Sequence, residues 1–597
     1  MKAPELIGDT WLGTAGRRLS LHDFRGRFLL LDFWTLCCVN CHHVLAELRP
    51  IESEFADVLT VVGVHSPKFE FEKDSNSVLS AVHRHGIDHP ILNDPEMATW
   101  SSYNVRAWPT LILVDPEGEI VGTWSGEGHG HAVSATLTEL IPRYQANGSL
   151  ISGKGLFAAE ESLAGTYLQP GKIETLDSER ILVSDSGHHS LAISLATAPN
   201  QPLQRIGTGK RGFTDGSFDQ AEFNEPYGAI VLPTDIAAKV GYQVVIADTV
   251  NHALRGIDLI EGMVTTIAGT GQQWRPGEPT SGNALATNLT TPWDVAWFNN
   301  LVYIAMAGDH RIWSFDPIAQ TVNSVAGTTH EGLVDGPVSE AWFAQPSALA
   351  VTDDSLWIAD SETSALRHIK QDTVTTAIGT GLFDFGHIDG SGDSARLQHP
   401  LGLAVHPDGS IYIADTYNGA IRRFDPKANN VSTVARDLAE PSDICFAADE
   451  HSILVVESAS GNITTIPIDQ TSTVTGQAMR TVRPEIDIAA GSVTVQVTFA
   501  PPPGEKIDDR YGPSTQLSIS ASPAHLILSG QGTSSDLVRT VSINPDVKSG
   551  VLHVAAKGAS CDADSEHGAC HMHQQDWGVP VRITISGTAS IELILAN

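Results

Sequence analysis

The stretch "FWTLCCVNCHH" (residues 33–43) holds three of the six cysteines of this 597-residue chain. Cys38 and Cys41 form a Cys-x-x-Cys pair directly after the apolar run "RFLLLDFW" (27–34). Residues 41–57 then carry apolar side chains at helical spacing, so we expect the pair to lie between a buried strand and the first turn of a helix. The free amides and dipole of a first turn stabilise a thiolate. The stretch therefore predicts a nucleophilic Cys38, with Cys41 one turn further on to resolve a mixed disulfide.

Two residues outside the cysteine motif add to this prediction. Asp32 ends the apolar run, where a sheltered carboxylate can exchange protons with the Cys41 thiol. Pro109, in "AWPT", begins a later strand-like run, where a cis-proline would present backbone to a substrate segment. Together these residues and the Cys-x-x-Cys pair resemble the motifs of the thioredoxin superfamily. The resemblance implies a thioredoxin-like fold, with Cys38 as nucleophile, Cys41 as resolving thiol and Pro109 as cis-proline.

The chain departs from that pattern inside the motif. Cys37 stands where thioredoxin-like proteins usually carry Trp, and the dipeptide between the paired cysteines is Val39-Asn40. Other interpretations stay open: a metal site that adds His42 or His43 to the cysteines, or an inherited motif that only packs. We expect Cys37 to be a small core residue. His65 is expected to pack at a strand end, and steering of the thiolate is the alternative.

The order of elements around the motif supports an α/β domain over residues 1–148. Strand-like and helix-like runs alternate, which predicts a small sheet covered by helices on both faces. The runs are a strand at 58–66, a helix at 76–86, a hairpin at 108–124 and a helix at 131–148.

Charge and hydropathy exclude several classes of partner. The formal net charge is −34, which disfavours nucleic acid and anionic membrane surfaces. Residues 1–18 lack the apolar core of a secretory signal, and no window approaches the ~20 apolar residues of a membrane span. We therefore expect a cytoplasmic protein, in which paired cysteines are more often catalytic or metal-binding than structural.

Residues 150–475 repeat one pattern six times. Each copy is an apolar strand, a polar turn and a second alternating strand, which predicts a closed six-bladed β-propeller. Four copies carry Asp in one register of the turn, and two depart from it. The copies are 182–193, 245–257, 303–315, 357–369, 412–424 and 454–466; the aspartates are Asp185, Asp248, Asp360 and Asp415, and the departures are Met306 and Glu457.

The turn pattern Asp-x-x-Asn/His-apolar-Arg, best seen at Asp248 and Asp415, resembles NHL repeats. We expect these aspartates to order their hairpins by accepting backbone N–H bonds, with a metal or catalytic role as the alternative. The resemblance implies a platform that binds a protein or a small ligand. Some propellers of related shape use a central metal, but no His/Glu set stands out here as axial ligands.

Residues 478–597 alternate apolar and polar residues without the propeller period, which predicts a small antiparallel β-sandwich. Arg483 and Pro484 look like part of the linker. Three interpretations of the segment 561–577 stay open: a disulfide or redox pair, a metal site, or two thiols in a β-loop. Its residues are Cys561, Cys570, His567, His571 and His573. Cys445, within the propeller, is expected to be buried packing.

The order of these parts resembles NHL-repeat proteins with a thioredoxin-like domain and a Cys-Cys-x-x-Cys motif. We therefore predict a cytosolic thiol–disulfide oxidoreductase with its protein or thiol substrate near Cys38, no cofactor and no metal. The propeller would bind a protein or a small ligand. The alternatives are a non-catalytic scaffold whose Cys-x-x-Cys pair is vestigial or redox-sensing, and a metal-bearing propeller enzyme.

Overall fold

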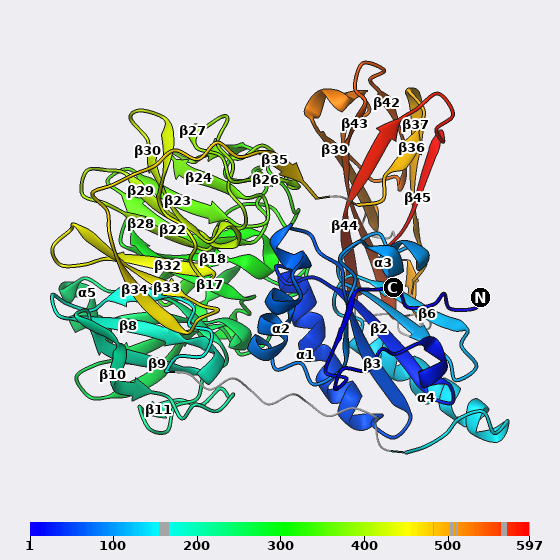
Figure 1. Ribbon diagram of the computed structural model, residues 1–597, viewed down its shortest axis with the longest axis horizontal. Coiled ribbons are helices and arrows are strands. Elements are labelled where there is room, and N and C mark those ends of the chain that lie inside the picture. Colours follow the sequence, from blue (N-terminus) through cyan, green and yellow to red (C-terminus); the bar gives the residue numbers. More distant parts are fainter. Residues whose placement is uncertain (154–165, 482, 502–504, 508–511, 563–569, 596–597) are drawn as a thin grey trace. The chain divides into compact units, whose positions relative to one another are not determined.

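The computed structural model describes residues 1–153, 166–481, 483–501, 505–507, 512–562 and 570–595 (Figure 1). The side chains of residues 562, 570 and 571 lie outside this description. The chain divides into two compact units, one of Met1–Ser162 with Val482–Asn597 and one of Leu163–Thr481. No helix among the described residues is long and apolar enough to cross a membrane.

The first unit begins with a six-stranded sheet in the order β1-β4-β3-β2-β5-β6. β2 lies at its centre, parallel to β3 and antiparallel to β5. Its residues are buried on both faces, as its uninterrupted apolar sequence requires. The strands are β1 (Thr10–Leu12), β2 (Phe28–Trp34), β3 (Leu59–His65), β4 (Ile91–Asn93), β5 (Thr110–Val114) and β6 (Ile120–Ser125).

Helices cover both faces of this sheet. They are α1 (Val39–Glu54), α2 (Ser75–Arg84), α3 (Ala98–Ser102) and α4 (Gly130–Ala146). Side chains of β2 alternate between the two cores: Leu31 packs in one cluster with Trp100 of α3, whereas Leu30 packs with Leu48 of α1. Asp32 therefore lies on the α1 face. The predicted α/β domain is confirmed, while the short β1, β4 and α3 were not anticipated.

Apart from one two-stranded sheet, the described strands of the second unit form six sheets, one for each predicted repeat (Figure 1). In sequence order their strands are β7 (Ile173–Thr175), β8 (Arg180–Asp185), β9 (Ser190–Leu195) and β10 (Ala198–Ile206); β11 (Gly216–Ser217), β12 (Pro226–Val231), β13 (Val244–Asp248), β14 (Ala253–Asp258) and β15 (Met263–Ala268); β16 (Ser281–Asn283), β17 (Pro292–Phe298), β18 (Leu301–Met306), β19 (Arg311–Asp316) and β20 (Thr321–Ala326); β21 (Gly336–Pro337), β22 (Pro346–Thr352), β23 (Ser355–Asp360), β24 (Ala365–Lys370) and β25 (Thr373–Ile378); β27 (Gly390–Ser391), β28 (Gly402–Val405), β29 (Ile411–Asp415), β30 (Ala420–Asp425) and β31 (Asn430–Ala435); and β32 (Pro441–Phe446), β33 (Ser452–Glu457) and β34 (Asn462–Pro467). α5 (Thr234–Val240) lies between β12 and β13, and β26 (Asp384–Gly386) pairs with β35 (Ala478–Arg480).

The six sheets close into a ring. The innermost strands β7, β12, β17, β22, β28 and β32 each contact the next, and β32 contacts β7. Asn200 joins the first sheet to the last, because its side-chain amide donates to the Ile463 carbonyl and accepts from the Ile463 amide. The predicted six-bladed propeller is confirmed.

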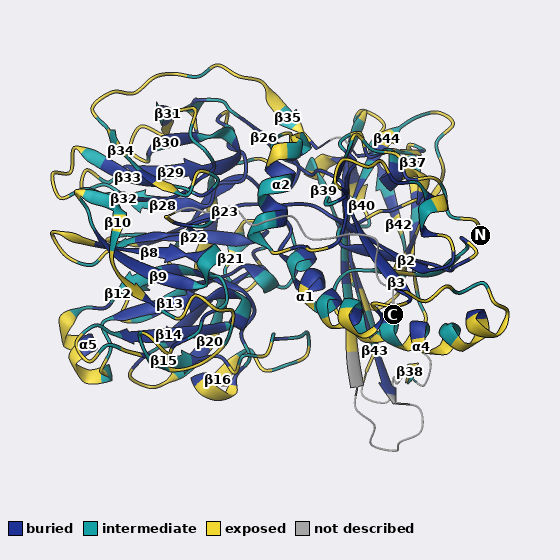
Figure 2. Cartoon of the chain, turned by 60° about the horizontal axis from the view of Figure 1, so that its bottom comes forward, coloured by how far each residue is buried: buried dark blue, intermediate teal, exposed yellow. Residues whose placement is uncertain are grey.

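The C-terminal domain is built from two sheets over one apolar core that includes Val495, Leu552 and Trp577. Most pairings are antiparallel, but β36–β44 and β37–β45 are parallel. Alternating hydropathy does not distinguish the two directions, because side chains alternate equally in both. The strands are β36 (Ile486–Ile488), β37 (Gly491–Phe499), β38 (Glu505–Ile507), β39 (Thr515–Ser522), β40 (Ile527–Ser529), β41 (Gly532–Ser534), β42 (Val538–Ile543), β43 (Ser549–Asp562), β44 (Cys570–Ile583) and β45 (Ser590–Leu595). Strands of this core carry both buried and more exposed residues (Figure 2), and buried residues alternate along β37 and β42.

Candidate functional site

The Cys-x-x-Cys pair lies at the start of α1. Cys38 is the N-cap residue, and its sulfur accepts the backbone N–H of Cys41 at 3.1 Å. The two cysteines form a disulfide with Cα atoms 5.2 Å apart. Cys38 is 5% exposed and Cys41 is fully buried. A thiolate released at Cys38 would face the free amides of the first turn, which lower a thiol pKa.

Pro109 follows a cis peptide bond from Trp108 at the start of β5. The Trp108 indole donates to the Ser66 carbonyl at 2.9 Å, which anchors the segment before the proline to the end of β3. Trp108 also packs against the apolar cluster that contains Cys38 and Cys41. The fold thus brings the cis-proline segment and the disulfide together although they are some 70 residues apart.

Asp32 is fully buried, and neither carboxylate oxygen has a hydrogen-bond partner among the described residues. The pKa of Asp32 is raised to about 7, mainly by burial; the charge of His89 lowers it and that of Glu52 raises it. A carboxyl that titrates near neutrality can donate or accept a proton during thiol chemistry.

Glu72 is a site residue that the sequence did not reveal. It lies in a short 3-10 turn (Phe71–Lys73) and is fully buried. One oxygen accepts the backbone N–H of Cys37 at 2.9 Å, and the other accepts the Thr35 hydroxyl and the Lys68 amide, both at 2.7 Å. Glu72 therefore holds the loop that leads into Cys38. Its setting in "KFEFEKD" resembles an exposed acidic run, so no local signal marked it.

The histidines near the motif have other partners than a metal. His42 Nε2 lies 3.0 Å from the Leu36 carbonyl, and His43 Nδ1 pairs with Glu127. Because Cys38 and Cys41 are joined to each other, the metal interpretation of this motif is not supported. Among the described residues no group of three or more metal-ligating side chains is placed to hold an ion.

The remaining residues near the motif are packing residues. Cys37 is 2% exposed and is not disulfide-bonded. His65 is fully buried, lies edge-on to Trp34 with ring centroids 5.2 Å apart, and pairs with Asn93 at 3.1 Å. Burial lowers the pKa of His65, so it packs as a neutral ring.

In the C-terminal domain Cys561 is disulfide-bonded and lies directly opposite Cys570 in the β43–β44 pair. This favours the disulfide interpretation over a metal site. His573 bonds to Ser560 at 2.9 Å. His567 and the side chain of His571 lie outside the described residues. Arg483 of the predicted linker lies over the Trp108 ring, with its guanidinium carbon 5.7 Å from the centroid.

The repeated aspartates of the propeller are structural. Asp248 accepts the Asn224 backbone amide at 2.8 Å and the Arg255 guanidinium at 2.7 Å, and all side-chain atoms of the Asp–Arg pair are buried. Asp415 repeats this arrangement with Arg422 at 2.6 Å. Where Met306 replaces the aspartate, Asp309 takes over by pairing with Arg311.

Two carboxylates converge at the centre of the propeller, but a lysine lies between them. Asp294 of β17 and Asp443 of β32 lie 3.5 Å and 3.7 Å from the ammonium nitrogen of Lys172, which also donates to the Leu401 carbonyl at 2.5 Å. All three charged side chains are buried. The position where a propeller enzyme would hold an axial metal is thus occupied by an ion pair.

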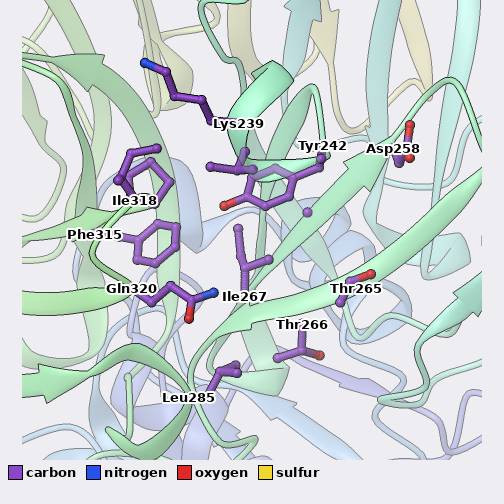
Figure 3. Close-up of a pocket in the computed structure, with 14 residues that line it drawn as sticks. Lys239, Tyr242, Asp258, Thr265, Thr266, Ile267, Leu285, Phe315, Ile318 and Gln320 are labelled. Carbon is purple, nitrogen blue, oxygen red and sulfur yellow. The ribbon is translucent and has the colours of Figure 1, made fainter. Parts of the chain in front are cut away.

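A pocket of about 640 Å³ lies between the second and third blades. Figure 3 shows the Tyr242, Ile267 and Phe315 side chains close to one another in it, with Thr265 and Gln320 nearby. Its size and mixed lining are typical of small-molecule sites.

Known protein families and relatives match both the N-terminal domain and the propeller of this chain. A thioredoxin-like family model matches residues 26–120, and an NHL repeat model matches residues 397–424. Protein SUPPRESSOR OF QUENCHING 1, chloroplastic, from Arabidopsis thaliana is 37% identical over 449 residues, which are 71% of this chain and 41% of that protein. NHL repeat-containing protein 2 from Gallus gallus is 35% identical over 477 residues, 73% of this chain and 64% of that protein.

The match thus spans 41% to 64% of the length of these relatives. Among solved structures, the pneumococcal exposed lipoprotein thioredoxin from Streptococcus pneumoniae is 31% identical, covers 23% of this chain and 98% of its own, and has a TM-score of 0.20. The two family models fall on the domain that carries the Cys-x-x-Cys pair and on the fifth propeller sheet. The chain is therefore an NHL-repeat protein in which a thioredoxin-like domain precedes the propeller.

Proposed function

We propose that the protein is a thiol–disulfide oxidoreductase that acts in the cytosol through Cys38 and Cys41. The supporting observation is the disulfide at the N-terminus of α1, packed in one cluster with Trp108 of the cis-proline segment. In the reducing direction the Cys38 thiolate attacks a client disulfide and releases one client thiolate. The Cys41 thiolate then attacks Cys38, which expels the second client thiolate and oxidises the pair by two electrons.

The experiment is a redox titration of the full chain and of Cys38→Ser and Cys41→Ser, with thiol trapping and mass spectrometry. We expect the pair to oxidise reversibly at a defined potential, and Cys41→Ser to retain clients as mixed disulfides on Cys38. Client capture by Cys38→Ser at the same level would contradict these roles. Thiols that remain unreactive in the folded protein would overturn the proposal.

A second candidate function is binding of a protein or a small ligand by the propeller, with the cysteine pair vestigial or acting as a redox sensor. The pocket beside Tyr242 and Phe315 favours it. Fragment screening by ligand-observed NMR tests it, with Tyr242→Ala as the comparison. Binders that compete with one another and are lost in this variant support the pocket, and unchanged binding excludes it.

A further inference from the structure

Several buried polar groups near the cysteine pair lack hydrogen-bond partners among the described residues. They include the carboxylate of Asp32, the indole nitrogen of Trp34 and Nε2 of His89, and also Asn40 Oδ1 and His65 Nε2. Asp32 and Trp34 are fully buried, and His89 is 8% exposed. Trp34 packs in the same cluster as Cys38 and Cys41. Buried polar atoms are almost always paired, so this group needs an explanation.

Gly63 lets the Trp34 and His89 rings, together with the Ile91 side chain, pack closely against β3. It is the register partner of Asp32 in the β2–β3 pair, so both residues are directed to the same face of the sheet. A Cβ atom at Gly63 would lie 2.9 Å from Trp34 Nε1 and 3.4 Å from His89 Nε2. The Gly63 amide donates to the Pro90 carbonyl at 3.0 Å, which holds the His89 segment beside this glycine.

The Nδ1 edge of the His89 ring contacts a residue that is partly exposed to solvent. Its Nδ1 lies 2.9 Å from a carboxylate oxygen of Glu52, a residue of α1 whose side chain is 29% exposed. The charges of His89 and Glu52 act on the pKa of Asp32 in opposite directions. Cys41 packs in one cluster with Trp34, and the His65 ring lies against Trp34. The other titratable residues of α1 are His42, His43, Glu47, Arg49 and Glu54.

We propose that His89 and Glu52 form a proton relay between Asp32 and solvent; the proposal rests on the oxidoreductase activity proposed above. When a client thiolate attacks Cys38, the Cys38–Cys41 bond breaks and Cys41 leaves as a thiolate. Asp32 gives its proton to that thiolate and regains one from His89 Nε2, while Nδ1 takes a proton delivered from solvent through Glu52. The second client thiolate then attacks the mixed disulfide and releases Cys38, so the client is oxidised and the pair reduced. His89 and Glu52 act only through Asp32.

The test uses the full chain and measures reduction of the Cys38–Cys41 disulfide by dithiothreitol from pH 5 to 9, in H₂O and D₂O. Rates are corrected for the concentration of dithiothreitol thiolate. The variants are His89→Gln and Glu52→Gln, with Glu52→Asp as the conservative rescue. The matched controls are His131→Gln and Glu139→Gln, which replace exposed residues of α4.

We expect His89→Gln to slow reduction at pH 7 by about tenfold or more, and to alter the pH profile and the solvent isotope effect. Glu52→Gln should slow it less, Glu52→Asp should restore the rate, and both controls should match the wild type. If His89→Gln unfolds, Glu52→Gln decides, because its side chain is partly exposed. Unchanged rates and profiles in both folded variants overturn the relay and leave the oxidoreductase standing. A wild-type pair that does not cycle overturns both proposals.

Discussion

Two carboxylates beside the cysteine motif have opposite environments at the residue scale. Glu72 accepts hydrogen bonds from Thr35, Cys37, Lys68 and Phe69. Asp32 accepts none among the described residues, and burial raises its pKa to about 7. The first carboxylate is therefore suited to hold a loop and the second to exchange a proton.

Asp32 should destabilise the folded domain as the pH rises. Its folded pKa of about 7 lies above the ordinary value of 3.8 for an aspartate, so between these values the folded state binds the proton more strongly than the unfolded state. Stability therefore falls across this window, by about 4 kcal/mol at most. Asp32→Asn removes this loss, so its gain in stability should be greatest above pH 7 and vanish below pH 4.

The measurement for Asp32→Asn is urea unfolding at several pH values, followed by labelling of the buried Cys37 thiol. A constant difference from wild type at every pH would contradict the predicted titration.

Glu72→Gln should loosen the loop before Cys38. The amide presents an NH₂ group where the carboxylate accepted N–H and O–H donors, and we expect a loss of about 2–3 kcal/mol. Labelling of Cys37 during urea unfolding measures the loss of stability. The alkylation rate of Cys38 in the reduced protein measures how far the loop has loosened. Glu70→Gln is the control, because the Glu70 side chain is exposed and forms a surface ion pair with Lys73 at 2.9 Å. Equal behaviour of the two variants would show that Glu72 does not hold the loop.

At the scale of elements, the hairpins of Asp248, Asp360 and Asp415 each contain a buried Asp–Arg ion pair. Asp415 accepts the amide of Gln398, the side chain of Asn418 and the guanidinium of Arg422, and so joins its hairpin to the preceding loop. Arg422 also pairs with the buried carboxylate of Asp389 at 2.6 Å, so one guanidinium lies between two carboxylates. The repeated Asp and Arg therefore belong to the architecture of the blade.

Asp415→Ala should lower the stability of the propeller by about 2–3 kcal/mol, because the Gln398 amide and the Asn418 side chain lose their acceptor and Arg422 loses one of its carboxylate partners. Asp354→Asn, which removes the exposed pair with Lys370, should leave it unchanged. Hydrogen exchange of the β29 and β30 amides in the full chain measures the stability of this blade in both variants. Similar exchange in the two variants would contradict a structural role for the repeated aspartate.

At the scale of the whole propeller, Lys172 links sheets that are far apart in sequence. It contacts Asp294 and Asp443, and Ile173 next to it donates to Asp443 at 2.9 Å. Burial raises the pKa of Asp443 to about 7 and also that of Asp294, while Lys172 opposes both shifts. The lysine thus lets two carboxylates share the centre of the ring.

Lys172→Met should destabilise the propeller, and the loss should grow as the pH rises from 5 to 8. Without the ammonium both carboxylates have still higher folded pKa values, so the folded state holds protons that the unfolded state releases. The loss should reach about 3–5 kcal/mol at pH 8. Calorimetry of the full chain across this range measures it, with Lys172→Met/Asp294→Asn/Asp443→Asn as the variant that regains stability. A loss independent of pH would indicate packing alone.

The motifs that lie close together in sequence were predictable. Cys38, Cys41 and the hairpin aspartates each follow a strand within a few residues, so local patterning located them. Glu72, Lys172 and the His89–Glu52 pair were not predicted, because each is defined by a partner on another element. Lys172 follows a proline as Asp294 and Asp443 do, in "PGK", "PWD" and "PSD", so an alignment of these tripeptides was the one available signal.

The sequence alone determined the three kinds of domain and the likeness of the first to thioredoxin, because hydropathy period, repeat length and short motifs depend on neighbouring residues. Tertiary structure decided which polar groups are buried together. Asp32 has a raised pKa because the fold buries it fully, and Glu72 supports its loop because four donors converge on it. The free energy of a charge depends on its whole surroundings, and those surroundings come from segments that only the fold brings together.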